Sequence, residues 1–298
     1  MAIPESQLET WSRQGAVETA EKTHESIRCA LRQYTDWPKG INYAVYLQGS
    51  YKNDTNIRGD SDVDVVVQLN STFQSDTSSL SEAEQYLYKS SFRDATYGWH
   101  DFRSDVLQAL RDYYDYQKVN EGKKSLKVKT PYLPADVVVC IQYRKYRRFR
   151  SIYDQEYIEG MTFYVPSEGR WVVNYPKLHY KNGVAKNGQS GANGWYKPTV
   201  RLFKNARTYL IDRNVISDDL APSYFLECLL YNVPNDKFGK TFRDTFWNIV
   251  NWLLKVDLSK FVCQNEQLPL FGGLPEQWSV SRAKDFLRSM LDLWKNWR

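Results

Sequence analysis

Three apolar runs predict the strands of a central sheet. They cover residues 43–47, residues 134–141 and residues 62–69, and the last of these reads Asp-Val-Asp-Val-Val-Val-Gln-Leu. β-Branched residues favour strands, and side chains in a strand alternate between its two faces. Asp62 and Asp64 are therefore expected to project from the same face of one strand.

The first 34 residues predict one long helix. From Pro4 to about Tyr34 the only glycine is Gly15, and an interrupted apolar stripe is formed by Leu8, Trp11, Val17, Ile27 and Leu31. Residues 38–40, Pro-Lys-Gly, end this pattern. We expect the helix to bridge two lobes.

The segments between the predicted strands differ in composition. Residues 71–81 contain seven serines or threonines and predict a loop. Residues 82–116 are largely helical in composition, and residues 123–129 are typical of a hairpin arm that leads into the strand at 134–141.

The second half of the chain predicts helices. The glycine- and asparagine-rich residues 187–194 form a loop, after which Pro198 fits the first turn of a helix. Residues 238–298 carry two apolar stripes at helical spacing, separated by a break at residues 269–275. The stripes are Phe242, Phe246, Ile249 and Leu253, and then Phe286, Met290, Leu293 and Trp297. Packing is their expected role.

The pair Asp62 and Asp64 indicates a metal site. Two carboxylates this close repel each other and resist burial without a cation, and oxygen ligands beside phosphate suit Mg²⁺ or Mn²⁺. A lone Asp-x-Asp is more commonly a solvated strand end, so the assignment depends on its context. Asp60 continues the alternation but stands beside Gly59 at the strand entrance, and we expect it to bind no metal.

Two further features supply that context. Asp136 begins the apolar run at 134–141, and adjacent strands would place it beside the first two acids as the third ligand of a two-metal site. The alternative is a turn residue after Leu133 and Pro134. Upstream, Gly49 and Ser50 form a turn whose backbone N–H groups and hydroxyl could hold a phosphate that glycine lets come close.

Composition narrows the class of protein. The 298 residues can bury a sizeable core, and the net charge of +5 suits nucleotides better than a dedicated duplex-binding surface. Four scattered cysteines show no paired spacing, which indicates neither a zinc site nor a disulfide framework and fits a reducing cytoplasm. No apolar run approaches the length of a membrane span, and the polar start is no signal peptide.

Gln48, Gly49, Ser50, Asp62, Asp64 and Asp136 together resemble the core of polymerase-β-type nucleotidyltransferases. The flanking sequence resembles, more narrowly, the bacterial cGAS/DncV-like nucleotidyltransferases (CD-NTases), which make cyclic di- or trinucleotide signals in anti-phage defence. The residues that carry this likeness are Asn174 to Lys177, His179, Asn182, Gly183, Asn193 to Pro198, Arg201 and Lys204. The acid pattern alone is shared by many nucleotidyltransferases, so it indicates the chemistry better than the product.

The resemblance implies roles for three residues of the second half. Lys204 would contact the triphosphate, Ser223 would bond it, and Tyr224 would stack on a base, which suits a helix N-terminus and an aromatic face. The alternatives are a solvated basic helix face formed by Lys197, Arg201 and Lys204, and a serine N-cap followed by a core tyrosine.

Three other features remain open. The amide of Asn174 could read a base edge, although an Asx-type turn before Tyr175 is the commoner explanation. His179 is expected to be structural. Residues 144–150 are the densest basic cluster, and we expect a charged strand or loop there rather than a nucleic-acid site.

These patterns predict an α+β protein with a mixed-sheet catalytic lobe at 1–158, which includes the N-terminal helix, and an α-helical lobe at 159–298, with nucleotides in the cleft between them. The predicted reaction is attack of a ribose hydroxyl on the α-phosphate of an NTP, repeated to close a ring. The alternatives are a template-independent transferase acting on RNA or protein, and a silent nucleotide-binding scaffold. We expect two Mg²⁺ or Mn²⁺ ions, a monomer, no membrane or nucleic-acid partner, and a separate effector protein that reads the product.

Overall fold

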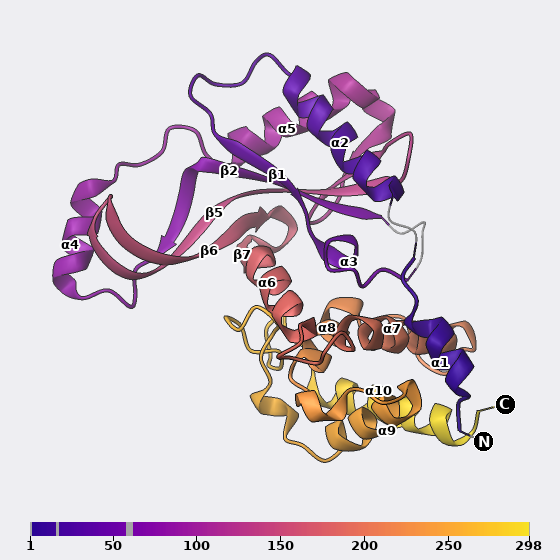
Figure 1. Cartoon of the computed structure of the whole chain (residues 1–298). Coiled ribbons are helices and arrows are strands. Elements are labelled where there is room, and N and C mark those ends of the chain that lie inside the picture. The colour runs from indigo at the N-terminus through magenta and orange to yellow at the C-terminus, as the bar shows by residue number, and fades with distance from the viewer. Residues whose placement is uncertain (1, 16–17, 58–61, 298) are drawn as a thin grey trace. The chain divides into compact units, whose positions relative to one another are not determined.

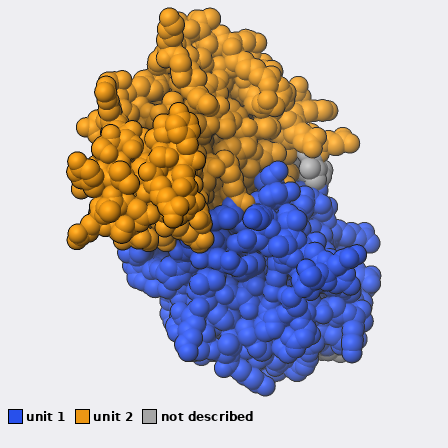
Figure 2. Space-filling model, turned by 60° about the vertical axis from the view of Figure 1, so that its left-hand side comes forward, with its two compact units in different colours: residues 1–16, 52–59, 178–298 blue, residues 17–51, 60–177 orange. Residues whose placement is uncertain are grey.

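The computed structural model describes residues 2–15, 18–57 and 62–297. The chain forms two compact units, each built from separate stretches of sequence (Figure 2). Residues 17–51 and 60–177 form the sheet unit, and residues 1–16, 52–59 and 178–298 form the helical unit. The predicted combination of a mixed sheet with a helical C-terminal domain is confirmed.

The sheet unit contains a seven-stranded sheet in which five strands follow the order β1-β2-β5-β4-β3. β6 pairs with β5, and β7 pairs with β6. The pairing of β2 with β5 is parallel and the other pairings are antiparallel, so the sheet is mixed. The strands are β1 (Tyr43–Leu47), β2 (Val63–Asp76), β3 (Val119–Glu121), β4 (Leu126–Lys129), β5 (Pro134–Ser151), β6 (Asp154–Val165) and β7 (Arg170–Asn174).

Helices α2 (Glu18–Gln33) and α5 (Trp99–Tyr114) lie side by side on one face of this sheet (Figure 1). Ile27 of α2 and Phe102 of α5 are fully buried in the same core as the valines of β2. Helix α4 (Glu82–Ser91) packs on the C-terminal part of β5. The one-turn helix α3 (Gly49–Lys52) follows β1 directly, and short 3₁₀ turns lie at Tyr116–Lys118 and Pro166–Glu168.

The helical unit surrounds a second core. Its helices are α1 (Glu5–Ser12), α6 (Pro176–Asn187), α7 (Tyr196–Asp212), α8 (Ser223–Tyr231), α9 (Phe242–Leu253) and α10 (Val280–Lys295), with 3₁₀ turns at Asn235–Lys237 and Leu258–Lys260. Phe246 and Ile249 of α9 and Phe286 and Met290 of α10 are fully buried, which confirms that the C-terminal stripes pack. None of the helices in the described parts of the chain is long and apolar enough to cross a membrane.

The predicted long N-terminal helix is wrong, because the structure has two helices there. Helix α1 ends at Ser12, and Arg13 is extended, with φ −69° and ψ 147°. The N–H of Gly15 then donates to the carbonyl oxygen of Asn56 at 3.1 Å, a bond that a continuous helix would not allow. The N-terminal segment therefore gives one helix to each unit, α1 to the helical unit and α2 to the sheet unit.

Three other boundaries differ from expectation. Strand β2 continues to Asp76, so the serine- and threonine-rich segment begins as a strand. The helical stretch predicted at 82–116 is interrupted by an extended Phe92, and α5 begins at Trp99 after the N-cap Gly98, whose N–H donates to the side chain of Asp101 at 2.9 Å. The unit boundary lies after Lys177 rather than after residue 158, because β6 and β7 complete the sheet.

Candidate active site

Parallel pairing of β2 with β5 brings two of the predicted acids together. Asp64 and Asp136 are register partners in this pairing, and both are half-buried. The expectation that Asp136 lies on the neighbouring strand is confirmed. Asp62 is exposed and immediately precedes β2, whereas Asp60 lies outside the described residues.

The Gly49 turn lies directly against Asp64. Gly49 has a φ of +67°, and a Cβ atom built there would lie 2.0 Å from Oδ2 of Asp64. The N–H of Gln48 donates to the carbonyl oxygen of Asp64 at 3.0 Å. Both the backbone conformation and the lack of space therefore require glycine, and Ser50 follows it as the second residue of α3.

The carboxylates near the starts of β2 and β5 supply part of the ligand set that a divalent cation needs. Asp64 and Asp136 offer hard oxygen ligands on adjacent strands, which Mg²⁺ and Mn²⁺ prefer. Across the described residues, no group of three or more His, Cys, Asp or Glu side chains is gathered closely enough to hold an ion. The structure thus brings together the pair, while the role of Asp62 as a ligand stays a prediction.

The predicted base-reading residue Asn174 ends β7. Its Oδ1 accepts a hydrogen bond from the N–H of Tyr175 at 2.8 Å. This bond to the next residue is not that of an Asx-turn, which needs the N–H two residues on, and Pro176 has no N–H. Base selection by Asn174 stays a prediction.

The basic face of α7 is not solvated, so that alternative is wrong. Lys197 Nζ lies 2.6 Å from Oδ2 of Asp54, and Arg201 donates to the backbone carbonyl of Asp54 at 2.5 Å. Lys204 is only 2% exposed, and its Nζ donates to the carbonyl oxygen and to Oγ1 of Thr55, both at 3.2 Å. All three cations hold the segment that follows α3.

Lys204 also forms an ion pair with Glu227 of α8, which is 5% exposed. The ammonium group has three N–H donors, and Thr55 and Glu227 together offer three acceptors. In this arrangement all three donors are used, so contact of Lys204 with a triphosphate would require its bond with Glu227 or one of its bonds with Thr55 to open.

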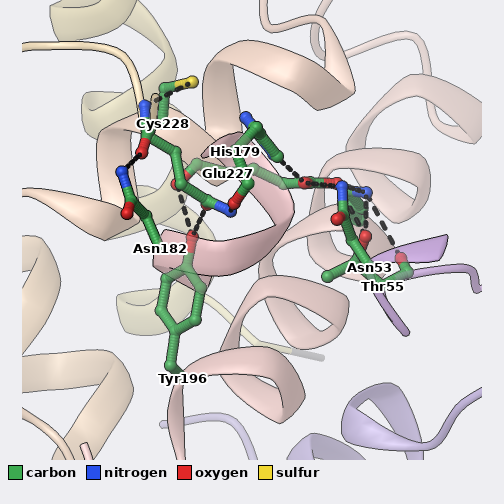
Figure 3. A network of polar contacts seen from close by, with 9 residues as sticks. Asn53, Thr55, His179, Asn182, Tyr196, Glu227 and Cys228 are labelled. Atoms are coloured by element: carbon green, nitrogen blue, oxygen red, sulfur yellow. Dashed lines mark hydrogen bonds and ion pairs between the residues drawn. The ribbon is translucent and has the colours of Figure 1, made fainter. Parts of the chain in front are cut away.

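Glu227 is the centre of a buried polar network (Figure 3). Besides Lys204, its carboxylate accepts from Thr55 Oγ1 at 2.7 Å and from Asn53 Nδ2 at 3.4 Å, and it lies 3.1 Å from Nε2 of His179. Burial raises the pKa of Glu227, but the charge of Lys204 and the hydrogen bond with His179 outweigh it and hold the pKa well below its usual range. The carboxylate is therefore charged inside the helical unit.

Ser223 and Tyr224 lie at the start of α8. Pro222 is the N-cap, so the predicted alternative of a serine N-cap is wrong, and Ser223 is an exposed residue of the first turn. The ring of Tyr224 stacks on His179, with centroids 5.3 Å apart and an interplanar angle of 24°. His179 thus links Tyr224 to Glu227, and a structural role for it stays our prediction.

The basic cluster at residues 144–150 lies on β5. Arg148 and Arg150 both pair with Asp154, and Arg147 lies 4.0 Å from Glu156, so two acids near the β5–β6 turn offset part of this positive charge. The guanidinium of Arg144 lies 3.7 Å from the ring centroid of Phe73. The cluster is therefore part of a charged strand, which is one of the two structures expected for it.

Sequence reasoning missed Glu227 and its partners Asn53 and Thr55. A signal was present, because Glu227 is the single charged residue in the apolar run Phe225-Leu226-Glu227-Cys228-Leu229-Leu230. A carboxylate on the buried face of a helix requires a cation or several donors. The sequence does not show which residues supply them.

Comparison with known proteins identifies the family. A model of the cGAS/DncV-like nucleotidyltransferase C-terminal helical domain matches residues 181–295, and a model of the nucleotidyltransferase domain matches residues 28–157. Cyclic UMP-AMP synthase from Rhodothermus marinus is 65% identical over 297 residues, covering 100% of this chain and 99% of that protein. This chain belongs to the cGAS/DncV-like nucleotidyltransferases.

Two further comparisons agree with this assignment. Cyclic nucleotide synthase CdnE01 from Staphylococcus haemolyticus is 41% identical, covering 100% of both chains. The solved structure of the Rhodothermus marinus c-UMP-AMP synthase with Apcpp and Upnpp has a TM-score of 0.91 and 64% identity, covering 99% of this chain and 97% of that chain. The predictions of a nucleotidyltransferase and of a cyclic nucleotide synthase are confirmed. Nucleotidyltransferases generally use divalent metal ions.

Gly49→Ala should reduce turnover by about 100-fold or more, because the new Cβ displaces the Asp64 carboxylate and a small misplacement of reacting groups is costly. The left-handed φ adds about 1–2 kcal/mol of strain. Pyrophosphate release measures the activity, and Gly40→Ala is the control. Gly40 also has a positive φ, of +81°, but a Cβ there meets nothing within 4 Å. Equal activity of the two variants would contradict the proposed contact with Asp64.

Lys204→Ala should lower the free energy of unfolding by about 3–5 kcal/mol, because it leaves the Glu227 carboxylate buried without its cation. Urea unfolding at pH 7 measures this. Since the pKa of Glu227 is lowered on folding, its contribution is present above the unfolded value of 4.5 and is lost as the pH falls below it. The difference between wild type and variant should shrink in acid. A loss below about 0.5 kcal/mol at pH 7 would fit a solvated lysine instead.

Proposed function

We propose that this enzyme joins one uridine and one adenosine nucleotide into a cyclic dinucleotide and releases pyrophosphate at each of two steps. The observation that carries the chemistry is Asp64 beside Asp136 on parallel strands, with the Gly49 turn packed against Asp64. The product is inferred from the 65% identity to cyclic UMP-AMP synthase over the whole chain.

In each step the oxygen of a ribose hydroxyl forms a bond to the α-phosphorus, and the bond from that phosphorus to the leaving pyrophosphate breaks. Asp62 and Asp64 would hold two Mg²⁺ or Mn²⁺ ions, and Asp136 would share the first ion and accept the proton of the attacking hydroxyl. When bound, such ions neutralise phosphate charge and lower the pKa of the hydroxyl. The second step repeats this chemistry within the linear dinucleotide and closes the ring.

The donor phosphates are assigned to residues at the start of two helices. Gly49 and Ser50 would provide backbone N–H groups and a hydroxyl at α3, and the exposed Ser223 would provide a hydroxyl at the start of α8. Gln48 stays assigned to nucleotide binding, but its N–H already donates to the carbonyl oxygen of Asp64. Tyr224 would stack on a base through the ring face that does not contact His179. Lys204 would join the phosphate contacts only by giving up its bond with Glu227 or a bond with Thr55.

The remaining parts of this proposal concern the biological setting. We propose a role in anti-phage defence in which a separate effector protein reads the product, because this is what the family implies. A monomer in the cytoplasm, without nucleic-acid or membrane partners, stays our prediction. The competing function is addition of nucleotides to RNA or to a protein by the same acids.

Asp62→Asn with Asp64→Asn should abolish turnover with little loss of folding, because these carboxylates are exposed or half-buried and are assigned to metal rather than to packing. Asp136→Asn should reduce the rate by about 100-fold or more through loss of the base. Pyrophosphate release and circular dichroism measure the two effects. Full activity of the double variant would reject the metal assignment, and full activity of Asp136→Asn would require another third ligand.

A mixture of UTP, ATP and Mg²⁺ should yield a product that survives phosphatase, because a cyclic dinucleotide has no terminal phosphate. Mass spectrometry of the survivors identifies the two bases, and Mn²⁺ and single-NTP reactions provide comparisons. The product should form without RNA or protein acceptor, and added RNA should not stimulate it. If labelled NTPs are used and the label appears only on added RNA or protein, the competing function, addition of nucleotides to such an acceptor, would be established instead.

Asn174→Ser should change the preference among NTPs more than it changes the total rate, if the amide reads a base edge. The measurement is the product distribution from an equimolar mixture of the four NTPs. Asn174→Asp is the matched control, because it keeps the Oδ1 acceptor for the Tyr175 N–H but lacks the amide donors. An unchanged distribution in both variants would leave Asn174 only its local hydrogen bond with the N–H of Tyr175.

A further inference from the structure

The segment Asn53–Asn56 is held more firmly than a surface connection between elements requires. It follows Ser50 closely along the chain and precedes Asp62. Asn53, Thr55 and Asn56 are 7%, 2% and 1% exposed, although all three are polar. Polar side chains are buried at a cost that only specific partners offset, so the conformation of this segment depends on those partners.

The backbone of the segment is also strained. Asp54 has a φ of +56°, in the left-handed region that residues other than glycine adopt only when their surroundings hold them there. Lys197 holds its side chain, and Arg201 holds its carbonyl oxygen. Strained residues over-determined by their neighbours are concentrated at functional sites.

Glu227 is where these contacts converge. Its carboxylate accepts from the Thr55 hydroxyl and from the Asn53 amide, and the same carboxylate neutralises Lys204. Thr55 completes the link, since its Oγ1 donates to Glu227 and accepts from Lys204. Packing alone would need no charge here, because apolar residues of similar volume are often as stable as a buried ion pair.

We propose that Glu227 is a positioning residue for nucleotidyl transfer, which acts through Thr55 by fixing the segment Asn53–Asn56. This inference rests on the proposed function. Along the chain the segment lies between the serine assigned to phosphate binding and one of the acids assigned to metal. Glu227 itself touches no reacting atom in this account.

The alternative explanation of the same contacts is that Glu227 restrains Lys204, which would otherwise bind phosphate. If Lys204 were a triphosphate ligand that Glu227 restrains, Glu227→Gln would release it and leave the KM for NTP equal or lower, whereas Lys204→Met would raise that KM. If both residues position the segment, the two substitutions have the same effect. Both should lower kcat by about tenfold or more while KM changes by less than about threefold, because misplaced groups slow the chemical step.

A matched pair at Thr55 tests the link without leaving a charge uncompensated. Thr55→Val keeps the shape and removes the hydroxyl, whereas Thr55→Ser keeps the hydroxyl. We expect Thr55→Val to reproduce the loss of kcat and Thr55→Ser to stay within about threefold of wild type. Ile249→Ala is the stability control, because it removes buried groups from the core of α9 and costs about 2–5 kcal/mol without touching the segment.

The experiment measures kcat and KM for pyrophosphate release in the full chain, below the melting temperature of every variant, with hydrogen exchange of residues 53–57 in nucleotide-free protein. Thr55→Val should exchange faster in this segment than Thr55→Ser, and Ile249→Ala should lower the melting temperature but keep kcat. If Glu227→Gln fails to fold, the Thr55 pair decides. Any one of three results would overturn the proposal. They are a wild-type kcat in Thr55→Val, opposite KM shifts in the Glu227 and Lys204 variants, and an equal loss of kcat in Ile249→Ala. An inactive wild type would instead reject the proposed function, and unchanged exchange in Thr55→Val would then reject the positioning contact as well.

Discussion

The parallel register between β2 and β5 is the constraint on which the rest of the site depends. It makes Asp64 and Asp136 neighbours although they are far apart in sequence. Two adjacent carboxylates are unfavourable without a cation, and this cost is the reason that their alignment indicates metal-dependent chemistry. A shift of one residue would turn one of the two acids to the opposite face of the sheet. The valines buried beside them on β2 and β5 stabilise the correct register.

The glycine turn extends the same constraint to the phosphate side of the site. Gly49 approaches Asp64 so closely that no side chain fits between them, and its positive φ turns the chain from β1 into α3. The backbone N–H groups of the turn are thereby fixed beside the acid strand. In the helical unit, a buried ion pair rather than apolar packing fixes the segment that follows α3. Charges buried in this way are costly to separate, which makes the arrangement specific.

Several features of the fold and site followed from local sequence patterns. The β-branched run at β2 and the acid at the start of β5 predicted the strands and the pair of carboxylates, and the C-terminal apolar stripes predicted the packing of α9 and α10. The long N-terminal helix was wrong, because residues 4–34 have helical composition throughout while the turn after Ser12 is stabilised by a bond from Gly15 to distant Asn56. Composition reports the propensity of a segment, and tertiary bonds can override it.

The sequence by itself determined the chemistry of the site, because a metal-dependent transfer needs carboxylates and a glycine turn at fixed short spacings, and such spacings are visible along the chain. Only the tertiary structure decided what the basic face of α7 does. Lys197, Arg201 and Lys204 have the spacing of a solvated helix face and of a phosphate site alike, and the structure pairs them instead with Asp54, Thr55 and Glu227. The physical reason is that helical spacing fixes which residues share a face, whereas the partners of that face are selected by the energy of burying charge. Two of these partners, Asp54 and Thr55, lie about 150 residues away along the chain.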